Sequence, residues 1–241
     1  MDSICANLQA VKLRIANAAR ACGRTDDIGL VAVSKTFPVE TIAAAHACGQ
    51  CAFGENYTQE AIEKIAALSE LGLEWHFIGP IQSNKARTIA EHFSWIHSVD
   101  RLKIAQRLSA ARPADVAPLQ VCIQVRIGGE STKSGVAPIH ALALARAVAA
   151  LPRLTLRGLM AIPPAGGDSV QQRHYFAQLR DLKNDLVAAG IALDTLSMGM
   201  SADLEAAIAE GATLVRVGTA IFGARQKKVP ATENTVPQRN T

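Results

Sequence analysis

The sequence predicts an α/β fold: a single (β/α)8 TIM barrel with an extra N-terminal helix and a disordered C-terminal tail. Short apolar strands alternate with helical segments along the chain, and no break in composition separates the eight units. The length of 241 residues is close to the roughly 250 of a complete barrel. Continuous apolar runs, such as LVAV at 30–33, are typical of strands buried on both faces, and therefore of a parallel sheet.

The predicted elements follow one another in regular order. The predicted strands are Leu30–Ser34, Cys51–Gly54, Trp75–Gly79, Trp95–Val99, Leu119–Val125, Leu156–Ala161, Thr195–Met198 and Leu214–Val217. The predicted helices between them are Val39–Cys48, Thr58–Leu71, Lys85–His92, Arg101–Ala111, Pro138–Ala150, Gln171–Ala189 and Ala202–Glu210. A doubly wound open sheet is the main alternative. The absence of a G-x-G-x-x-G motif after the first strand counts against it.

The N-terminal segment 1–23 is predicted to be an amphipathic helix that lies on the barrel. Its apolar side chains recur at helical spacing, at Ile4, Leu8, Val11, Ile15 and Ala18. Polar residues interrupt every apolar stretch, which argues against a signal peptide. No apolar run of the chain approaches the ~20 residues that span a membrane. We therefore expect a cytoplasmic protein with no membrane partner.

The C-terminal end has a different composition. The segment QKKVPATENTVPQRNT holds no apolar periodicity, so we expect 226–241 to be a disordered tail and the barrel domain to cover 1–225. The net charge of +4 is modest, and only 4% of the residues are aromatic. A nucleic-acid-binding protein usually concentrates basic residues on one face, with aromatics between them. We therefore expect no nucleic-acid partner.

Cysteine and histidine usage predicts structural roles. Five cysteines, an odd number, fit a reducing compartment better than a disulfide framework. Cys48 and Cys51 form a C-x-x-C pair, but a redox pair normally sits at a helix N-terminus and these residues end a helix and open a strand. We predict structural thiols at both positions. The histidines lack the spacing of a metal site, and His76, inside an apolar strand, is predicted to be a hydrogen-bonded core residue.

Lys35 directly follows the first predicted strand. In this fold the carboxyl ends of the strands and the loops behind them build the functional site. A lysine there points into the mouth of the barrel, where desolvation favours the neutral amine that forms a Schiff base. A lysine that extends to solvent has the same sequence position, so position alone leaves both interpretations open.

Asn56 follows the second predicted strand. Its amide offers a hydrogen-bond donor and an acceptor to a ligand oxygen, although a helix N-cap explains the residue equally well. The neighbouring Glu55 is a candidate acid/base group, or an ion-pair partner of Lys35 or Lys85. The sequence leaves its role open.

Two segments near the C-terminus are typical of phosphate binding. Gly199 lets the backbone approach a ligand, and Ser201 precedes a predicted helix, whose N-terminus attracts anions. A plain N-cap serine is the alternative. Gly218 and Thr219 follow the eighth strand, and loops after strands 7 and 8 commonly bind phosphate in this fold. Arg216 projects inward beside them and needs a partner, with a buried structural ion pair as the alternative.

Taken together, an inward lysine after strand 1 and a phosphate loop after strands 7 and 8 face one pocket, because strands 1 and 8 are neighbours in a closed barrel. An aldehyde that carries a phosphate would satisfy both features, and pyridoxal 5′-phosphate (PLP) is such a molecule. A sugar-phosphate aldolase satisfies them equally.

Several stretches resemble the pyridoxal-phosphate homeostasis protein family: AVSKT, FGENY, WHFIGPIQSNK, LRGLMAI, LSMGMSADLEAAI and VRVGTAIFGAR. The resemblance runs from about Leu30 to Arg225 and implies the fold-type III barrel of the alanine racemase N-terminal domain. It implies that Lys35 forms the internal aldimine with PLP and that Arg216 faces the pyridine nitrogen. The other cofactor-binding residues that it implies are Asn56 and Met200, and, at the phosphate, Ser201, Gly218 and Thr219.

The function that the resemblance implies is vitamin B6 (PLP) homeostasis and amino/keto acid balance, with PLP released to apo-enzymes and no robust catalysis. Two features agree with this. An arginine beside the pyridine nitrogen cannot accept its proton, which leaves the ring a weaker electron sink. A two-base racemase also needs a second acid/base group, which related racemases take from a tyrosine of a C-terminal β-domain. The two tyrosines here, Tyr57 and Tyr175, do not lie in a second domain.

The chain departs from the family pattern at Phe37, where many members have lysine, and at Arg126, which replaces the more usual asparagine. Lys133, in the loop after the fifth strand, is either a second, transient cofactor site or a solvated lysine. One alternative function is a single-domain PLP-dependent amino-acid racemase, completed by Tyr57 of a second subunit. Another is a Schiff-base aldolase that uses Lys35 without a cofactor. We expect a monomer, since the helix surfaces show no sustained heptad.

Overall fold

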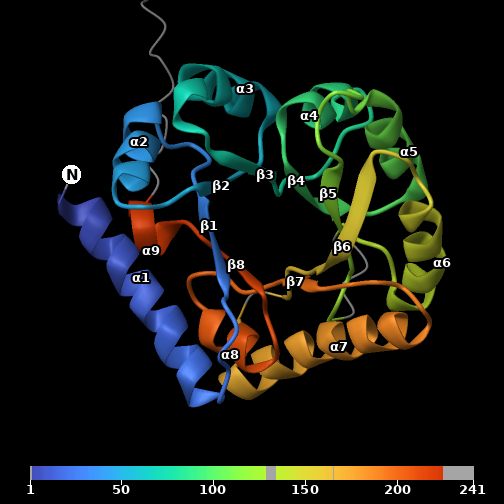
Figure 1. Cartoon of the computed structure of the whole chain (residues 1–241). Coiled ribbons are helices and arrows are strands. Elements are labelled where there is room, and N and C mark those ends of the chain that lie inside the picture. The colour runs from blue at the N-terminus through green and yellow to red at the C-terminus, as the bar shows by residue number, and fades with distance from the viewer. Residues whose placement is uncertain (1, 129–133, 165, 225–241) are drawn as a thin grey trace, which may run out of the picture.

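The computed structural model describes residues 2–128, 134–164 and 166–224, and it confirms the predicted barrel (Figure 1). Eight parallel strands close in sequence order, so that β1 pairs with β2 on one side and with β8 on the other. The strands are β1 (Gly29–Val33), β2 (Ala52–Glu55), β3 (Glu74–Phe77), β4 (Trp95–Val99), β5 (Leu119–Gln124), β6 (Leu154–Met160), β7 (Thr195–Ser197) and β8 (Leu214–Val217).

Helices surround the strands on the outside of the barrel (Figure 1). They are α1 (Asp2–Ala21), α2 (Val39–Ala47), α3 (Thr58–Ala67), the 3-10 helix η1 (Ser69–Leu71), α4 (Ala86–His92), α5 (Leu102–Ala111), α6 (Pro138–Ala149), α7 (Ser169–Ala188), α8 (Leu204–Ala209) and α9 (Thr219–Phe222). Each predicted helix is present, with ends shifted by at most a few residues. The sequence did not predict α9, because four residues are too few to show a helical period.

The strands separate two buried regions of different character. Side chains that point outward from β2, β3 and β4 pack against the helices, as Phe77 does against Phe93 with ring centroids 5.2 Å apart. The barrel interior holds a small separate apolar cluster of Trp95, Cys122 and Met160. It also holds buried polar side chains. Both regions draw on the same strands, because successive residues of a strand point to opposite faces.

The N-terminal helix lies on the barrel, as its periodicity predicts. Leu8, Val11 and Ile15 are buried in the main core. The Asn7 amide donates to the Ile221 carbonyl of α9 at 3.0 Å, and Arg14 pairs with Glu205 of α8 at 2.8 Å. Helix α1 therefore covers the side of the barrel that β8 and its following helix form.

The structure overturns one prediction about the cysteines. Cys48 is not a free thiol but forms a disulfide with Cys5, which ties α1 to the end of α2, with the Cα atoms 5.5 Å apart. The local C-x-x-C pattern hid this pairing because the partner lies 43 residues away in the sequence. Cys51 and Cys22 are exposed thiols, and Cys122 is a buried one.

Some predictions fall on residues that the structure does not describe. Lys133 and the tail 226–241, with the domain boundary at 225, lie outside the described ranges. Within those ranges, every helix is too short or too polar to cross a membrane.

Candidate functional site

The predicted site residues lie at or just after the carboxyl ends of four neighbouring strands, β7, β8, β1 and β2. Lys35 comes two residues after the end of β1 and is half-buried. The preceding Ser34 points away from the barrel axis, because its hydroxyl donates to Glu55 Oε1 at 2.7 Å and its carbonyl accepts from Lys64 of α3. Continued alternation beyond the strand would direct Lys35 the opposite way, toward the barrel mouth.

Asn56 comes directly after β2 and is half-buried. Its Oδ1 atom is fully buried and has no hydrogen-bond partner within the described part of the chain. A buried polar atom without a partner is costly and is expected to be satisfied by a group outside the protein. Asn56 is not a helix N-cap, since Tyr57 occupies that position before α3.

The loop after β7 turns back toward β8 at Gly199. This residue has φ of 93°, a conformation that favours glycine, and its carbonyl accepts from the Arg216 N–H at 2.9 Å. The Met200 N–H donates to Asp203 Oδ1 at 2.5 Å, which fixes the turn before α8. Met200 is 37% exposed. Helix α8 begins only at Leu204, so Ser201 lies in this turn and not, as predicted, at the helix start.

Arg216 points into the barrel and is 4% exposed. Its Nη1 donates to the carbonyl and the hydroxyl of Ser197, both at 2.6 Å, and its Nη2 donates to the Ala161 carbonyl at 3.0 Å. Burial lowers the pKa of Arg216 to about 10, so the guanidinium remains charged at neutral pH. The predicted inward orientation is confirmed, but no buried ion pair holds this side chain among the described residues.

Gly218 and Thr219 lead from β8 into α9. Gly218 packs closely on β1, because a Cβ atom at this position would lie 3.1 Å from the Val33 carbonyl oxygen. Thr219 is exposed. The turn after β8 and the residues before Lys35 are therefore neighbours, as the closed barrel requires.

Glu55 is not a partner of Lys35 or Lys85. It is fully buried behind the strand, where Lys64 Nζ contacts its Oε1 at 2.7 Å and Glu60 at 2.5 Å. Burial raises the pKa of Glu55, and Lys64 acts in the opposite direction. This cluster joins β2 to α3 and lies on the outer side of the strands.

The structure also confirms His76 as a hydrogen-bonded core residue and adds two residues that the sequence did not single out. His76 Nδ1 lies 2.9 Å from His97 Nε2, and His97 Nδ1 lies 2.6 Å from the Ser197 hydroxyl. Their common signal is that each stands on a strand at a position facing the interior. Recognising it requires the register of strands on opposite sides of the barrel.

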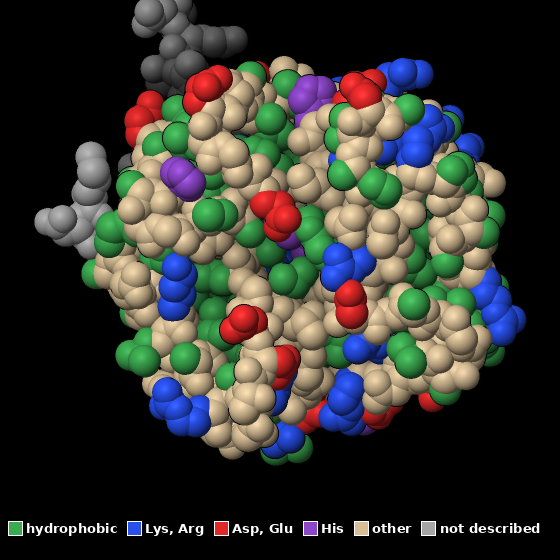
Figure 2. Space-filling view, viewed as in Figure 1, with side chains coloured by type: hydrophobic (Ala, Val, Ile, Leu, Met, Phe, Trp, Pro, Cys, Tyr) green, Lys and Arg blue, Asp and Glu red, His purple; other side chains and the backbone are tan. Residues whose placement is uncertain are grey.

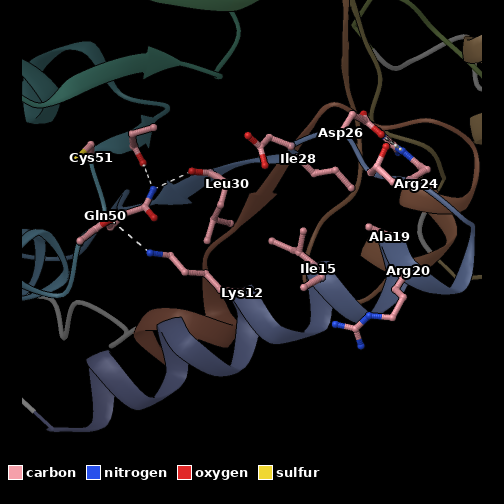
Figure 3. A pocket seen from close by; sticks show the side chains of 15 residues that line it. Lys12, Ile15, Ala19, Arg20, Arg24, Asp26, Ile28, Leu30, Gln50 and Cys51 are labelled. Atoms are coloured by element: carbon pink, nitrogen blue, oxygen red, sulfur yellow. Dashed lines mark hydrogen bonds and ion pairs between the residues drawn. The ribbon is translucent and has the colours of Figure 1, made fainter.

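A cavity of about 630 Å³ lies elsewhere, between α1 and the first residues of β1 and β2 (Figure 3). Lys12 crosses it to the Gly49 carbonyl, and the Gln50 amide bridges the Leu30 and Ala52 carbonyls. Because Leu30 and Ala52 lie at the starts of their strands, within the first two residues, this cavity belongs to the amino-terminal end of the barrel. It is separate from the residues that follow the strands.

Comparison with known proteins gives consistent matches along the chain. A model of the family "Alanine racemase, N-terminal domain" matches residues 6–226. A pyridoxal phosphate homeostasis protein of Pseudomonas aeruginosa is 59% identical over 232 residues, 96% of this chain and 100% of the relative. Its counterpart in Escherichia coli is 53% identical over 229 residues, 93% of this chain and 98% of the relative.

Solved structures agree with this. The structure of PipY from Synechococcus elongatus with PLP bound is 39% identical, with a TM-score of 0.81, and the match covers 91% of this chain and 100% of PipY. An alanine racemase of Clostridium difficile is 18% identical, with a TM-score of 0.71, and the match covers 95% of this chain and 58% of the racemase. The second likeness shows the fold alone.

Proposed function

Since this chain belongs to the family of the alanine racemase N-terminal domain, we propose that it binds PLP and serves in PLP homeostasis. The relatives named pyridoxal phosphate homeostasis protein match nearly their whole length, and PipY binds PLP on the same fold. The observation on the chain itself that carries the proposal is the convergence, at the carboxyl ends of the strands, of the half-buried Lys35, the buried Arg216 and the turns at Gly199 and Gly218.

The residues that would hold PLP divide by the part of the molecule they meet. Lys35 would bond to the aldehyde carbon, and Arg216 would face the ring nitrogen. Asn56 and Met200 would line the ring. The phosphate would be held in the turns after β7 and β8 by Ser201, Gly218 and Thr219.

The geometry fits such a ligand in two respects. The partnerless Asn56 Oδ1 marks a buried acceptor at the end of β2 that a ligand donor would satisfy. The turn at Gly199 lies against Val215 of β8, and the turn at Gly218 lies against Val33, two residues before Lys35. These observations support one pocket that extends from β7 to β2.

Bound PLP would supply an aldehyde that captures amines and a ring that withdraws electrons. Arg216 carries a permanent charge with no basic site, so it would donate to the ring nitrogen and would not exchange a proton with it. Tyr57 is 56% exposed beyond β2, and Tyr175 lies on α7, where its hydroxyl accepts from Gln171 at 3.2 Å. Neither position suggests a second acid/base group, which favours a carrier over the racemase alternative.

The proposal includes transfer of PLP to apo-enzymes and a cytoplasmic location, where carrier and recipients would meet. It also includes a monomeric barrel domain of residues 1–225.

The first experiment is borohydride reduction of purified protein incubated with PLP, followed by absorbance spectra and peptide mapping. We expect the native chain to carry reduced PLP on Lys35, and Lys35→Ala to lose it. Lys12→Ala is the control, because Lys12 lies in the cavity at the other end of the barrel and its removal leaves labelling intact. Absence of any adduct on the native chain, or labelling retained in Lys35→Ala, would contradict the proposal. Sustained racemisation of an amino acid that depends on Lys35 would favour the enzyme alternative.

A further inference from the structure

A continuous chain of polar side chains crosses the interior of the barrel. We call it the interior chain, and its members are Glu74 and His76 on β3, His97 on β4, Ser197 on β7 and Arg216 on β8. Each contact is a short hydrogen bond: 2.8 Å from Glu74 to His76, 2.9 Å from His76 to His97, and 2.6 Å for each of the two that follow. The strands β3 and β4 stand opposite β7 and β8 in the closed order, so the chain connects two walls of the barrel (Figure 1).

The two ends of the interior chain differ in their access to water. The four inner residues are buried, with His97 and Ser197 at 0% exposure. The Glu74 side chain is 49% exposed at the start of β3. Figure 2 shows charged side chains distributed over the face of the molecule that is turned to the viewer. The interior chain thus leads from solvent, at Glu74, to the Arg216 guanidinium at the candidate site.

Packing fixes the imidazole rings. The His76 ring stacks on Trp95 at 5.5 Å with an interplanar angle of 10°, and it meets the His97 ring edge-on. Arg157 lies 5.0 Å above the same Trp95 ring and pairs with Asp194. Neither imidazole is therefore free to rotate away from its hydrogen bonds.

The chemistry of the two ends determines the direction of every hydrogen bond. Arg216 can only donate, and an ionised Glu74 can only accept. A neutral imidazole has one donor and one acceptor, so His76 donates from Nε2 to Glu74 and accepts at Nδ1 from His97 Nε2. His97 then accepts at Nδ1 from the Ser197 hydroxyl, which in turn accepts from Arg216. All the donors therefore point from Arg216 toward Glu74.

The surroundings favour neutral imidazoles and an ionised carboxylate. Burial lowers the pKa of His76 and lowers that of His97 well below its ordinary value, and the charge of Arg216 acts on His97 in the same direction. The hydrogen bond from His76 lowers the pKa of Glu74. Arg216 is consequently the only cation at the inner end of the interior chain.

We propose that Ser197, His97 and His76 are positioning residues that hold the Arg216 guanidinium toward the ring nitrogen of PLP, with Glu74 as their anchor at the opposite mouth of the barrel. This inference rests on the proposed function, since it assigns the interior chain to the same site. Its consequence is that a change at the surface near Glu74 alters PLP affinity at the other end of the barrel.

The direction of the hydrogen bonds is testable without PLP. Two-dimensional ¹H–¹⁵N spectra of the histidine rings in the ligand-free native protein distinguish the two neutral tautomers and the charged form. We expect both His76 and His97 to carry their proton on Nε2 at neutral pH. A proton on Nδ1 of either ring, or a doubly protonated ring, would overturn the inference whatever the protein binds.

The effect of the interior chain on PLP binding is tested by removing its hydrogen bonds at Ser197. Ser197→Ala removes one hydroxyl and leaves the carbonyl that Arg216 also uses, and we expect the Kd for PLP to rise about tenfold, or about 1.4 kcal/mol. The absorbance spectrum of bound PLP changes as well, because the guanidinium reorients. Ser109→Ala is the matched control, because it removes a buried hydroxyl on α5 that is not part of the interior chain and donates to the Pro152 carbonyl at 2.6 Å. We expect this variant to leave the Kd unchanged.

Glu74 gives a second test that does not depend on a core substitution. Glu74→Leu removes the acceptor and is expected to raise the Kd for PLP about threefold, about 0.65 kcal/mol. Glu74→Gln keeps an acceptor oxygen and remains within a factor of about 1.5 of the native Kd, about 0.24 kcal/mol. If the native chain binds PLP and none of the Ser197 and Glu74 variants changes the Kd or the spectrum, the positioning role is wrong and the proposed function stands. If the native chain fails to bind PLP, the proposed function itself is wrong.

Discussion

Two buried cations, Lys64 and Arg216, lie on opposite sides of the same barrel wall and are neutralised differently. Lys64, behind β2, contacts the carboxylates of Glu55 and Glu60 directly, at 2.7 and 2.5 Å. Arg216, inside the barrel, contacts only oxygens of Ser197 and Ala161, and across the described ranges no carboxylate lies within ion-pair distance of it. Its nearest hydrogen-bonded carboxylate is Glu74, three neutral side chains away.

The difference separates a structural charge from one that is available to a ligand. A cation in direct contact with buried carboxylates stabilises the fold, because removal of either partner leaves the other as a buried charge with neither a counter-ion nor water. A guanidinium whose hydrogen bonds go only to neutral oxygens, with the charge of Asp203 acting on it from beyond ion-pair distance, keeps most of its field for an incoming group. The comparison predicts that Lys64 governs stability and that Arg216 governs binding.

Lys64→Met tests whether Lys64 stabilises the fold, and it has the largest expected effect on the free energy of unfolding. Glu55 would keep a buried charge with only the Ser34 hydroxyl as a partner, so we expect the free energy of unfolding to fall by about 3–5 kcal/mol. Urea denaturation at neutral pH measures it. Lys103→Met, at an exposed position of α5, is the control and should shift stability by less than about 0.5 kcal/mol. A loss below about 1 kcal/mol for Lys64→Met would show that the cluster is not structural.

Arg216→Met tests whether Arg216 governs PLP binding more than it governs stability. The Ser197 and Ala161 carbonyls lose a donor, at about 1–3 kcal/mol, while the burial of a charge is relieved. We therefore expect a smaller loss of stability than for Lys64→Met, and a weakening of PLP binding by at least about tenfold. Equilibrium titration with PLP and urea denaturation of the same preparation give both numbers. A variant that binds PLP as the native chain does would remove Arg216 from the site.

The pH dependence of the stability of Glu55→Gln tests the raised pKa of Glu55 beside Lys64. Burial raises the pKa of Glu55 above its ordinary value, so the folded state binds this proton more tightly than the unfolded state does. The stability that this proton contributes is present below the unfolded pKa and is lost as pH rises through the folded pKa. Gln cannot ionise, so the stability of Glu55→Gln relative to the native chain should increase as pH rises from the unfolded pKa of about 4.3 through the raised folded pKa. A difference that stays constant with pH, or moves the other way, would contradict the assigned shift.

Glu205→Gln provides the smallest expected effect and the reference for exposed charges. Glu205 pairs with Arg14 at 2.8 Å, but the two side chains are 52% and 39% exposed. Solvent screens such a pair, so the change in the free energy of unfolding should stay within about 0.5 kcal/mol. Thermal and urea denaturation check it. A larger loss would show that this contact does more than hold α1 against α8.

Much of the site could be predicted from the sequence because its residues mark ends of strands. Lys35, Asn56, Arg216 and Gly218 each lie within or just after a strand whose apolar run is visible in the sequence. In a parallel barrel all such ends meet at one mouth, so local pattern is enough to bring these residues together. The inward orientation of Arg216 is confirmed on this basis.

Other features depend on contacts between distant segments. Glu55 looked like a neighbour of Lys35, yet its partner is Lys64, because strand alternation turns Glu55 outward onto α3. The Cys5–Cys48 disulfide depends on where α1 packs. The start of α8 at Leu204 depends on the turn that Asp203 fixes through Met200.

The sequence by itself determined the order of elements, the closed barrel and the residues at its mouth, since these follow from local periodicity and from the ends of strands. Only the tertiary structure decided which polar side chains meet inside it. His76, His97, Ser197 and Arg216 come from four strands, and a shift of one residue in any of them would turn its side chain to the outer face. Their hydrogen bonds are a property of strand register across the barrel, which no local pattern records.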